Sequence, residues 1–410
     1  MADNCGVCLE LPDKYSCGWC GDQCDVQEKC LDRNHNTLVW LNKQQTCPDP
    51  QIRSFFPRSG PWEGGTNITI EGINLGRSYE DIIGGVYIAY SQNGQFVSQI
   101  NCIPFREEYV KTSRITCQVQ SPNITSPQKS AASAPPSGQI VVKIQNEYIA
   151  MSKDSFAFVN PKITHIEPSK GPKSGGTRLQ IWGLHMDAGS LVEAFVGNNY
   201  CRVVKREKTR AECITSESRL GEEKVRVRFD NGIRSFDDYK FLFVEDPKIT
   251  SVESGPAGQQ AGPRGIPGGG IAITVKGDNL NSVQKPLMYV EVEGVKYNSS
   301  CLFESAKEMK CKSPQVPFQK LSRLFSDTES GDPIELHYGF IMDDVKSVQS
   351  LTSKPFDRFP KFLMYPNPHY LNFSEPGGVK YYKSDYLTIN VSIPAPNDLS
   401  ESVLPLLTVI

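Results

Sequence analysis

The distribution of thirteen cysteines constrains the fold more than any other feature of this chain. Seven of them lie between residues 5 and 47. The other six form three short-range pairs: Cys102 with Cys117, Cys201 with Cys213, and Cys301 with Cys311. A dense cluster followed by evenly spaced pairs is typical of disulfide-bonded proteins from oxidising compartments. We therefore expect a small disulfide-rich module, followed by domains in which each pair forms a structural bridge that contributes about 3 kcal/mol.

Length and composition allow several packed domains. The chain has 410 residues, enough for about three or four domains. Hydrophobic residues make up 38% of the chain and charged residues 22%, which suits domains with buried cores. The net charge of −2 argues against a nucleic-acid partner, because such proteins usually present a strongly basic surface. No run approaches the roughly 18 apolar residues of a membrane span, and residues 1–5 lack the apolar core of a signal peptide.

Sequons for N-glycosylation agree with an extracellular location. The pattern N-x-S/T predicts surface attachment sites in a secreted protein. It occurs at five positions: Asn67, Asn123, Asn298, Asn372 and Asn390.

A repeated pattern organises the chain after the cysteine cluster. Copies begin at Pro50, Pro161 and Pro247, 111 and 86 residues apart, and a fainter copy begins near Pro366. We predict an all-β fold, in which a small cysteine-rich module is followed by tandem immunoglobulin-like β-sandwiches in an elongated or curved array. Short proline-containing junctions should restrict bending between the sandwiches. The predicted domains are residues 1–48, 49–160, 161–246 and 247–365, with 366–410 as the start of a further repeat.

Each copy contains a segment that predicts a strand. After a glycine pair, apolar residues alternate with others, and alternation with period two is typical of a half-buried strand. The glycine pairs, such as Gly64–Gly65 and Gly175–Gly176, predict tight turns with positive φ. The glycine that closes each strand predicts a bulge or a close approach of another backbone segment. The alternating residues are Ile68, Ile70 and Gly72; Leu179, Ile181 and Gly183; and Ile273, Val275 and Gly277.

The cluster and the repeats resemble modules of a receptor family. The run CGVCLELPDKYSCGWCGDQCDVQEKC from Cys5 to Cys30, followed by Cys47, resembles the PSI module of plexins, semaphorins and integrins. The pattern GPxxGGTxxxIxG of the repeats resembles IPT (TIG) domains, and residues 338–348 (YGFIMDDVKSV) are similar to a stretch typical of plexins. A PSI module followed directly by IPT repeats is similar to the plexin ectodomain.

This resemblance implies a structural role for the chain rather than a catalytic one. A plexin is a single-pass membrane receptor for semaphorins that acts in axon guidance and cell migration, and it binds semaphorin through a propeller outside this segment. The resemblance therefore implies a stalk that positions the ligand-binding head and shapes an autoinhibited or dimeric ectodomain, with self-association of ectodomains as an expected partner interaction. The alternative is that an IPT repeat itself binds a protein ligand, as in receptors of the hepatocyte growth factor receptor type.

The resemblance also implies a disulfide pairing, which spacing alone leaves open. PSI modules of this type carry eight cysteines, and here the first is missing. Cys17 is then expected to be unpaired, with its partner upstream of this sequence. The implied bridges are Cys5–Cys47, Cys8–Cys24 and Cys20–Cys30.

Several sharper alternatives find less support in the sequence. Cys17-Gly-Trp-Cys20 has the spacing of a redox motif, but no βαβ pattern surrounds it. Two C-x-x-C pairs in the cluster could hold zinc, although only eight residues separate them. The basic run 205–210 is interpreted as an exposed hairpin rather than a DNA contact, and Asp343–Asp344 as a solvated turn rather than a calcium site. We predict no enzyme activity, no cofactor, no metal site and no nucleic-acid partner.

Overall fold

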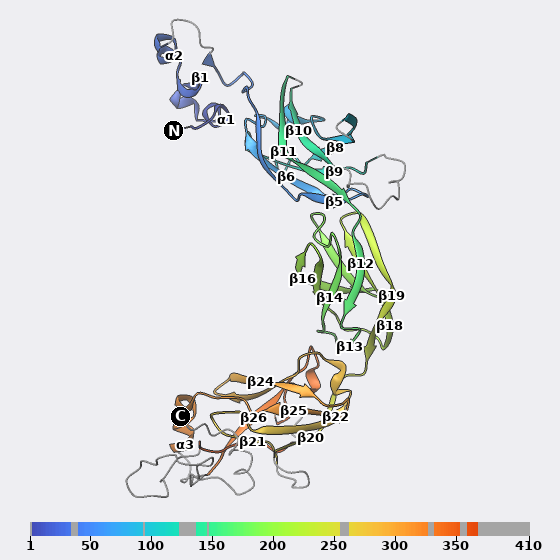
Figure 1. Ribbon diagram of the computed structural model, residues 1–410. Helices are drawn as coiled ribbons and strands as arrows, with labels where there is room; N and C mark the ends of the chain where they lie inside the picture. The colour runs from blue at the N-terminus through green and yellow to red at the C-terminus, as the bar shows by residue number, and fades with distance from the viewer. Residues whose placement is uncertain are drawn as a thin grey trace, which may run out of the picture. The chain divides into compact units, whose positions relative to one another are not determined.

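The structure is a computed structural model, and its ribbon is shown in Figure 1. It describes residues 2–33, 40–92, 95–122, 137–145, 147–254, 262–326, 332–352 and 359–367. The further repeat predicted at 366–410 therefore lies outside the described residues from position 368 onward. The chain divides into two compact units, and strands of the second sandwich belong to both. The first unit comprises residues 1–167, 180–213 and 224–238, and the second comprises 168–179, 214–223 and 239–410. Among the described residues, no helix is long and apolar enough to cross a membrane.

The N-terminal module is small and its core consists largely of cysteines. Three strands form an antiparallel sheet in the order β2-β1-β3. Trp19, only 9% exposed, packs with Leu9 and the buried half-cystines, as expected of a core residue in a module with few other apolar side chains. The elements are α1 (Cys5–Leu9), a 3-10 turn η1 (Asp13–Tyr15), β1 (Cys17–Cys20), β2 (Gln23–Val26), α2 (Gln27–Arg33) and β3 (Trp40–Leu41).

The first sandwich has two sheets that share one long strand. The strand order is β4-β6-β9-β8-β7-β10-β11-β5. Residues 95–101 of β8 pair with β7, and residues 102–104 pair with β9, so β8 passes from one sheet to the other. The elements are β4 (Gln51–Phe56), β5 (Ser59–Pro61), β6 (Asn67–Ile73), η2 (Tyr79–Ile82), β7 (Val86–Gln92), β8 (Gln95–Pro104), β9 (Arg114–Val119), β10 (Ser137–Ile144) and β11 (Tyr148–Val159).

The second sandwich repeats this topology. Its strand order, β12-β14-β17-β16-β15-β18-β19-β13, matches the first position by position. The hairpin between β16 and β17 carries the basic run 205–210, whose residues are exposed or half-buried, as predicted. The elements are β12 (Lys162–Glu167), β13 (Lys170–Pro172), β14 (Arg178–Leu184), β15 (Val192–Val196), β16 (Asn199–Glu207), β17 (Arg210–Ile214), β18 (Gly221–Phe229) and β19 (Gly232–Val244).

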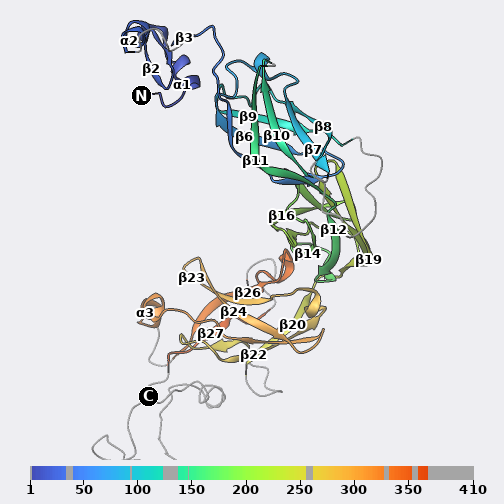
Figure 2. The ribbon, with the colours of Figure 1, turned by 45° about the horizontal axis from the view of Figure 1, so that its top comes forward.

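The third sandwich has the same order, β20-β22-β25-β24-β23-β26-β27-β21, and one additional helix. Helix α3, labelled in Figure 2, lies between β25 and β26 in the sequence and buries Leu321 in the core of this sandwich. No helix was predicted from the sequence at this place. The elements are β20 (Lys248–Ser254), β21 (Arg264–Gly265), β22 (Ala272–Asp278), η3 (Leu280–Ser282), β23 (Leu287–Val292), β24 (Val295–Phe303), β25 (Glu308–Lys312), α3 (Phe318–Ser326), β26 (Ile334–Ile341), η4 (Lys346–Val348) and β27 (Phe362–Met364).

The recurring sequence pattern has the structural basis that was predicted for it. Ile68 and Ile70 on β6 are 0% exposed, as are their equivalents on β14 and β22. The closing glycine, Gly72, lies against the backbone of β4, where a Cβ atom would come within 2.1 Å of the carbonyl oxygen of Gln51. The register of β4 also shifts between Ile52 and Ser54, which indicates a bulge at this approach. The equivalent strand pairs in the other two sandwiches show the same shift.

Candidate interdomain contact sites

The cysteines of the N-terminal module form three disulfides. These join Cys5 to Cys47, Cys8 to Cys24 and Cys20 to Cys30. Cys17 is the free cysteine, and its half-exposed thiol lies 3.3 Å from the backbone oxygen of Tyr15 as a donor. The zinc alternative is therefore wrong, because three of the four sulfurs in the two C-x-x-C pairs are bonded to other sulfurs. No group of metal-ligating side chains is found in the part of the chain that the structure describes.

Each sandwich carries one disulfide between two neighbouring strands. The bridges join β8 to β9, β16 to β17 and β24 to β25. All six sulfur-bearing residues are at most 5% exposed, so these bridges belong to the sandwich cores and not to a reactive surface. They are Cys102–Cys117, Cys201–Cys213 and Cys301–Cys311.

Two of the five sequons fall on described residues. Asn67 begins β6, and Asn298 lies within β24; both are exposed. Asn123, Asn372 and Asn390 lie outside the described residues.

The clearest concentration of specific polar contacts outside the cores is found where one module meets the next. We call the contact between the N-terminal module and the first sandwich the first joint. The contacts between the first and second sandwiches and between the second and third sandwiches are the second and third joints. The first two lie within the first compact unit and the third lies within the second unit.

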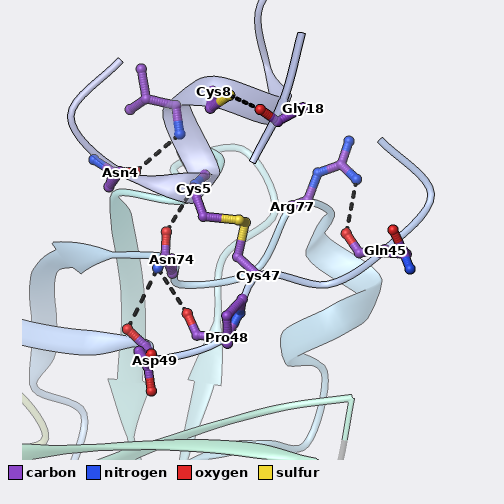
Figure 3. Close-up of a disulfide and its surroundings, with 12 residues drawn as sticks. Asn4, Cys5, Cys8, Gly18, Gln45, Cys47, Pro48, Asp49, Asn74 and Arg77 are labelled. Atoms are coloured by element: carbon purple, nitrogen blue, oxygen red, sulfur yellow. Dashed lines mark hydrogen bonds between the residues drawn. A yellow bond between two sulfur atoms is a disulfide. The ribbon is translucent and has the colours of Figure 1, made fainter. Parts of the chain in front are cut away.

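Asn74 is central to the first joint (Figure 3). Its Oδ1 accepts a hydrogen bond of 2.8 Å from the backbone N–H of Gly6, and its Nδ2 donates to the carbonyl oxygen of Pro48 at 2.9 Å. The side chain is 8% exposed and the backbone is left-handed, with φ of 57°. At Gly6 a Cβ atom would come within 2.5 Å of the Cβ of Thr112, so this approach of α1 to the sandwich requires glycine.

A second set of contacts in the first joint runs through Gln145. The hydroxyl of Thr46 donates to its Oε1 at 2.5 Å, and its Nε2 donates to Asp81 at 2.8 Å. Burial alone would raise the pKa of Asp81, but hydrogen bonds from Gln145, Ser78 and the backbone of Arg77 hold this pKa below its usual value. Because Thr46 precedes Cys47, this contact attaches a disulfide-fixed residue of the module to the sandwich.

Asp230 connects the two sides of the second joint. Its carboxylate accepts hydrogen bonds from the hydroxyl of Thr66 in the first sandwich at 2.6 Å and from the hydroxyl of Ser190 in its own sandwich at 2.8 Å. The backbone N–H of Leu191 donates to the same carboxylate at 2.8 Å. The hydroxyl of Ser190 in turn accepts from the backbone N–H of Asn67 across the joint, at 3.0 Å.

An ion pair adds to the second joint. Arg234 of the second sandwich lies 2.9 Å from the carboxylate of Glu63 in the first. The same guanidinium donates to Asn160 and to the carbonyl oxygen of Pro161, the two residues that connect the sandwiches, each at 3.0 Å. The Arg234 side chain is 18% exposed but that of Glu63 is 42% exposed, so solvent still screens this ion pair in part.

The third joint brings Thr177 of the second sandwich to Asp343 of the third. The threonine hydroxyl donates to the carboxylate at 2.7 Å, and the backbone N–H of Asp344 lies 3.3 Å from the carbonyl oxygen of Gly175. Burial raises the pKa of Asp343 to about 6; the hydrogen bond from Thr177 opposes this, and the neighbouring charge of Asp344 adds to it. The interpretation of Asp343–Asp344 as a solvated turn therefore holds for Asp344, which is exposed, and is wrong for Asp343, which is half-buried and hydrogen-bonded to the second sandwich.

The loop on the other side of the third joint is also attached to the connecting residues. Lys173 forms an ion pair of 2.8 Å with Glu245, and the hydroxyl of Ser174 donates to Asp246 at 2.7 Å. The connection between the second and third sandwiches is therefore bonded to the loop that precedes Gly175, the residue that contacts Asp344.

These joint residues were not predicted from the sequence. Thr66 and Thr177 each belong to a GGT triplet of the repeat, but only the glycines of that triplet predicted a structural feature. The recurrence of threonine was the one available signal. The acceptors Gln145 and Asp230 carry no distinctive local pattern.

Comparison with known proteins assigns the modules. The plexin repeat (PSI) family matches residues 1–48, and the IPT/TIG domain family matches residues 50–158 and 161–243. Plexin A3 of Danio rerio is 30% identical over 97% of this chain, and Plexin-A2 of Mus musculus is 28% identical over 92%. The chain spans about a fifth of their length, 20% and 18%. Among solved structures, the full extracellular region of Plexin A4 superimposes with a TM-score of 0.72 at 27% identity, covering 91% of this chain and 29% of that one.

The PSI module, the disulfide-bonded sandwiches and these likenesses define the class of protein as the extracellular portion of a plasma-membrane receptor. Within that class, the chain belongs to the plexin family.

Proposed function

We propose that this chain is the stalk segment of a semaphorin receptor. In this proposal semaphorin binds elsewhere in the receptor, and the PSI module and sandwiches hold the ligand-binding head at a defined distance and orientation. The stalk also shapes an autoinhibited or dimeric ectodomain in axon guidance and cell migration. The membership of the plexin family supports the receptor assignment.

The observation that carries the stalk proposal is the set of joints. Each described module contacts the next through buried or half-buried hydrogen bonds, and the second joint adds an ion pair. Modules connected only by solvated linkers would reorient freely, and few specific contacts would cross their boundary. Contacts of this kind restrict reorientation, which is the property that a spacer with mechanical function needs.

The growth-factor alternative is less well supported. It requires a sandwich with its own ligand-binding surface, and the relatives that match this chain over its length are plexins.

Two measurements on the purified chain test the proposal. Class averages from negative-stain electron microscopy should show one dominant arrangement of the modules, and immobilised chain should not capture a semaphorin ectodomain. A continuum of arrangements contradicts the stalk proposal. Saturable semaphorin binding to this chain contradicts the assignment of binding to another region.

A further inference from the structure

One turn occupies the same place in all three sandwiches. It follows β10 in the first, β18 in the second and β26 in the third. Each turn contains a residue with left-handed backbone, at φ of 48°, 46° and 48° respectively. Residues other than glycine seldom adopt this conformation, and the three side chains that do so here all carry an acceptor oxygen. These residues are Gln145, Asp230 and Asp343.

Each of these residues accepts a hydrogen bond from a threonine of the preceding module. The donors are the hydroxyls of Thr46, Thr66 and Thr177, at 2.5, 2.6 and 2.7 Å. The donors come from two kinds of module, because Thr46 belongs to the PSI module and the other two to sandwiches. The receiving turn is therefore the common element.

The glycine before the threonine allows the turn to approach in both sandwich-to-sandwich joints. A Cβ atom at Gly65 would come within 2.4 Å of the side chain of Asn231, and one at Gly176 within 2.4 Å of the backbone nitrogen of Asp344. Both glycines also have positive φ, of 85° and 82°. The geometry of the GGT triplet is thus fitted to the turn of the next sandwich as well as to its own fold.

We propose that this turn is a docking site for the preceding module, and that the threonine hydroxyl on its left-handed residue fixes the orientation of each module relative to the next. This inference deepens the proposed stalk function, on which it rests, by naming the partner surfaces. Both an amide and a carboxylate serve as the acceptor, since the first sandwich has Gln145 where the other two have an aspartate. In the third sandwich, Ile271 follows the glycine pair at the position of Thr66 and Thr177, and it is 0% exposed. Isoleucine has no hydroxyl, so this position of the third sandwich cannot donate the hydrogen bond.

Hydrogen exchange of the full chain tests the inference. The backbone N–H groups of Gly189 and Asn67 donate across the second joint, to the carbonyl oxygen of Ser59 and the hydroxyl of Ser190. The substitution Thr66→Val keeps the shape of the side chain and removes the hydroxyl. We expect about tenfold faster exchange at Gly189 and Asn67, as for the loss of a hydrogen bond to a charged group. Exchange that changes less than about twofold overturns the inference.

Matched variants separate docking from folding. Thr66→Ser keeps the hydroxyl and should exchange like the wild type. Thr164→Val removes an exposed hydroxyl that donates to Trp182 within the second sandwich, and should leave the joint amides unchanged. If Thr66→Val also accelerates exchange in the core strands of the first sandwich, the same comparison is made at the third joint with Thr177→Val and the N–H of Asp344. If the joint amides of the Thr→Val variants exchange as in the wild type, and electron microscopy shows one dominant arrangement of the modules, only this inference is refuted. If the wild-type chain itself shows many arrangements, the stalk proposal is refuted.

Discussion

The third joint should become more stable as the pH falls from 7.5 to 5. The pKa of Asp343 is about 6 in the joint against an ordinary value of 3.8. The docked state therefore binds the proton more tightly than an open, solvated turn does. The charged carboxylate weakens the joint above pH 6, and this penalty disappears as the pH falls from 6 toward 3.8.

The magnitude follows from the same two pKa values. At about 1.4 kcal/mol per pKa unit, the full penalty above pH 6 is about 3 kcal/mol. Between pH 7.5 and pH 5 about half of it is relieved, which corresponds to a roughly tenfold smaller open population of the joint. Burial of Asp343 in the joint raises its pKa most; the hydrogen bond from Thr177 lowers this pKa and the adjacent carboxylate of Asp344 raises it. Lys173, Glu245 and Asp246 lie on the facing loop and its connection.

Hydrogen exchange at Asp344, corrected for the intrinsic effect of pH, measures the open population. We expect protection at pH 5 to exceed that at pH 7.5 by about tenfold. Histidines also change charge in this range, so Asp343→Asn serves as the matched control: the amide still accepts from Thr177 but does not titrate. Equal protection of the wild type at both pH values, or an equal gain in the Asn variant, refutes the assignment to Asp343.

Three further outcomes are expected. Thiol titration of the denatured chain without reductant should detect one reactive cysteine, Cys17; a count of none or of three contradicts the pairing. Asn74→Gly should lower the stability of the first joint by about 1–3 kcal/mol, seen as faster exchange at Gly6, because it leaves buried partners without a hydrogen bond while the left-handed backbone is retained; unchanged exchange at Gly6 counts against this role. Gly277→Ala should lower the free energy of unfolding of the third sandwich by about 1–3 kcal/mol, and clearly more than Gly268→Ala, since a Cβ at Gly277 comes within 2.0 Å of the carbonyl oxygen of Lys248 whereas one at Gly268 meets only side-chain atoms, at 3.5 Å or more; equal denaturation midpoints would argue against that close approach.

Features that depend on residues close together in the sequence could be predicted from it. The alternation that ends at Gly72 identifies a strand because side chains on one face of a strand recur every second residue. The same glycine predicted a bulge or a close approach of another backbone segment, and the structure shows both features there. The likeness to plexins was also readable, because it rests on the order of cysteines and on one recurring motif.

The joints could not be predicted in the same way. Thr46 and Gln145 are 99 residues apart in sequence, and Thr66 and Asp230 are 164 apart. Pairing at such distances depends on how folded modules meet, and neither partner carries a local signal for the other. The misinterpretation of Asp343 has the same origin, because no local signal shows that a second domain binds one of two adjacent carboxylates.

Distance measurement between spin labels on the first and second sandwiches tests the central claim, that the joints fix the orientation of the modules. Labels can be placed at the exposed positions Lys153 and Lys208, with Cys17→Ser removing the free thiol. We predict one narrow distance distribution, which broadens with Thr66→Val. A distribution that is already broad in the chain with Thr66, or one that stays narrow without its hydroxyl, would contradict the account.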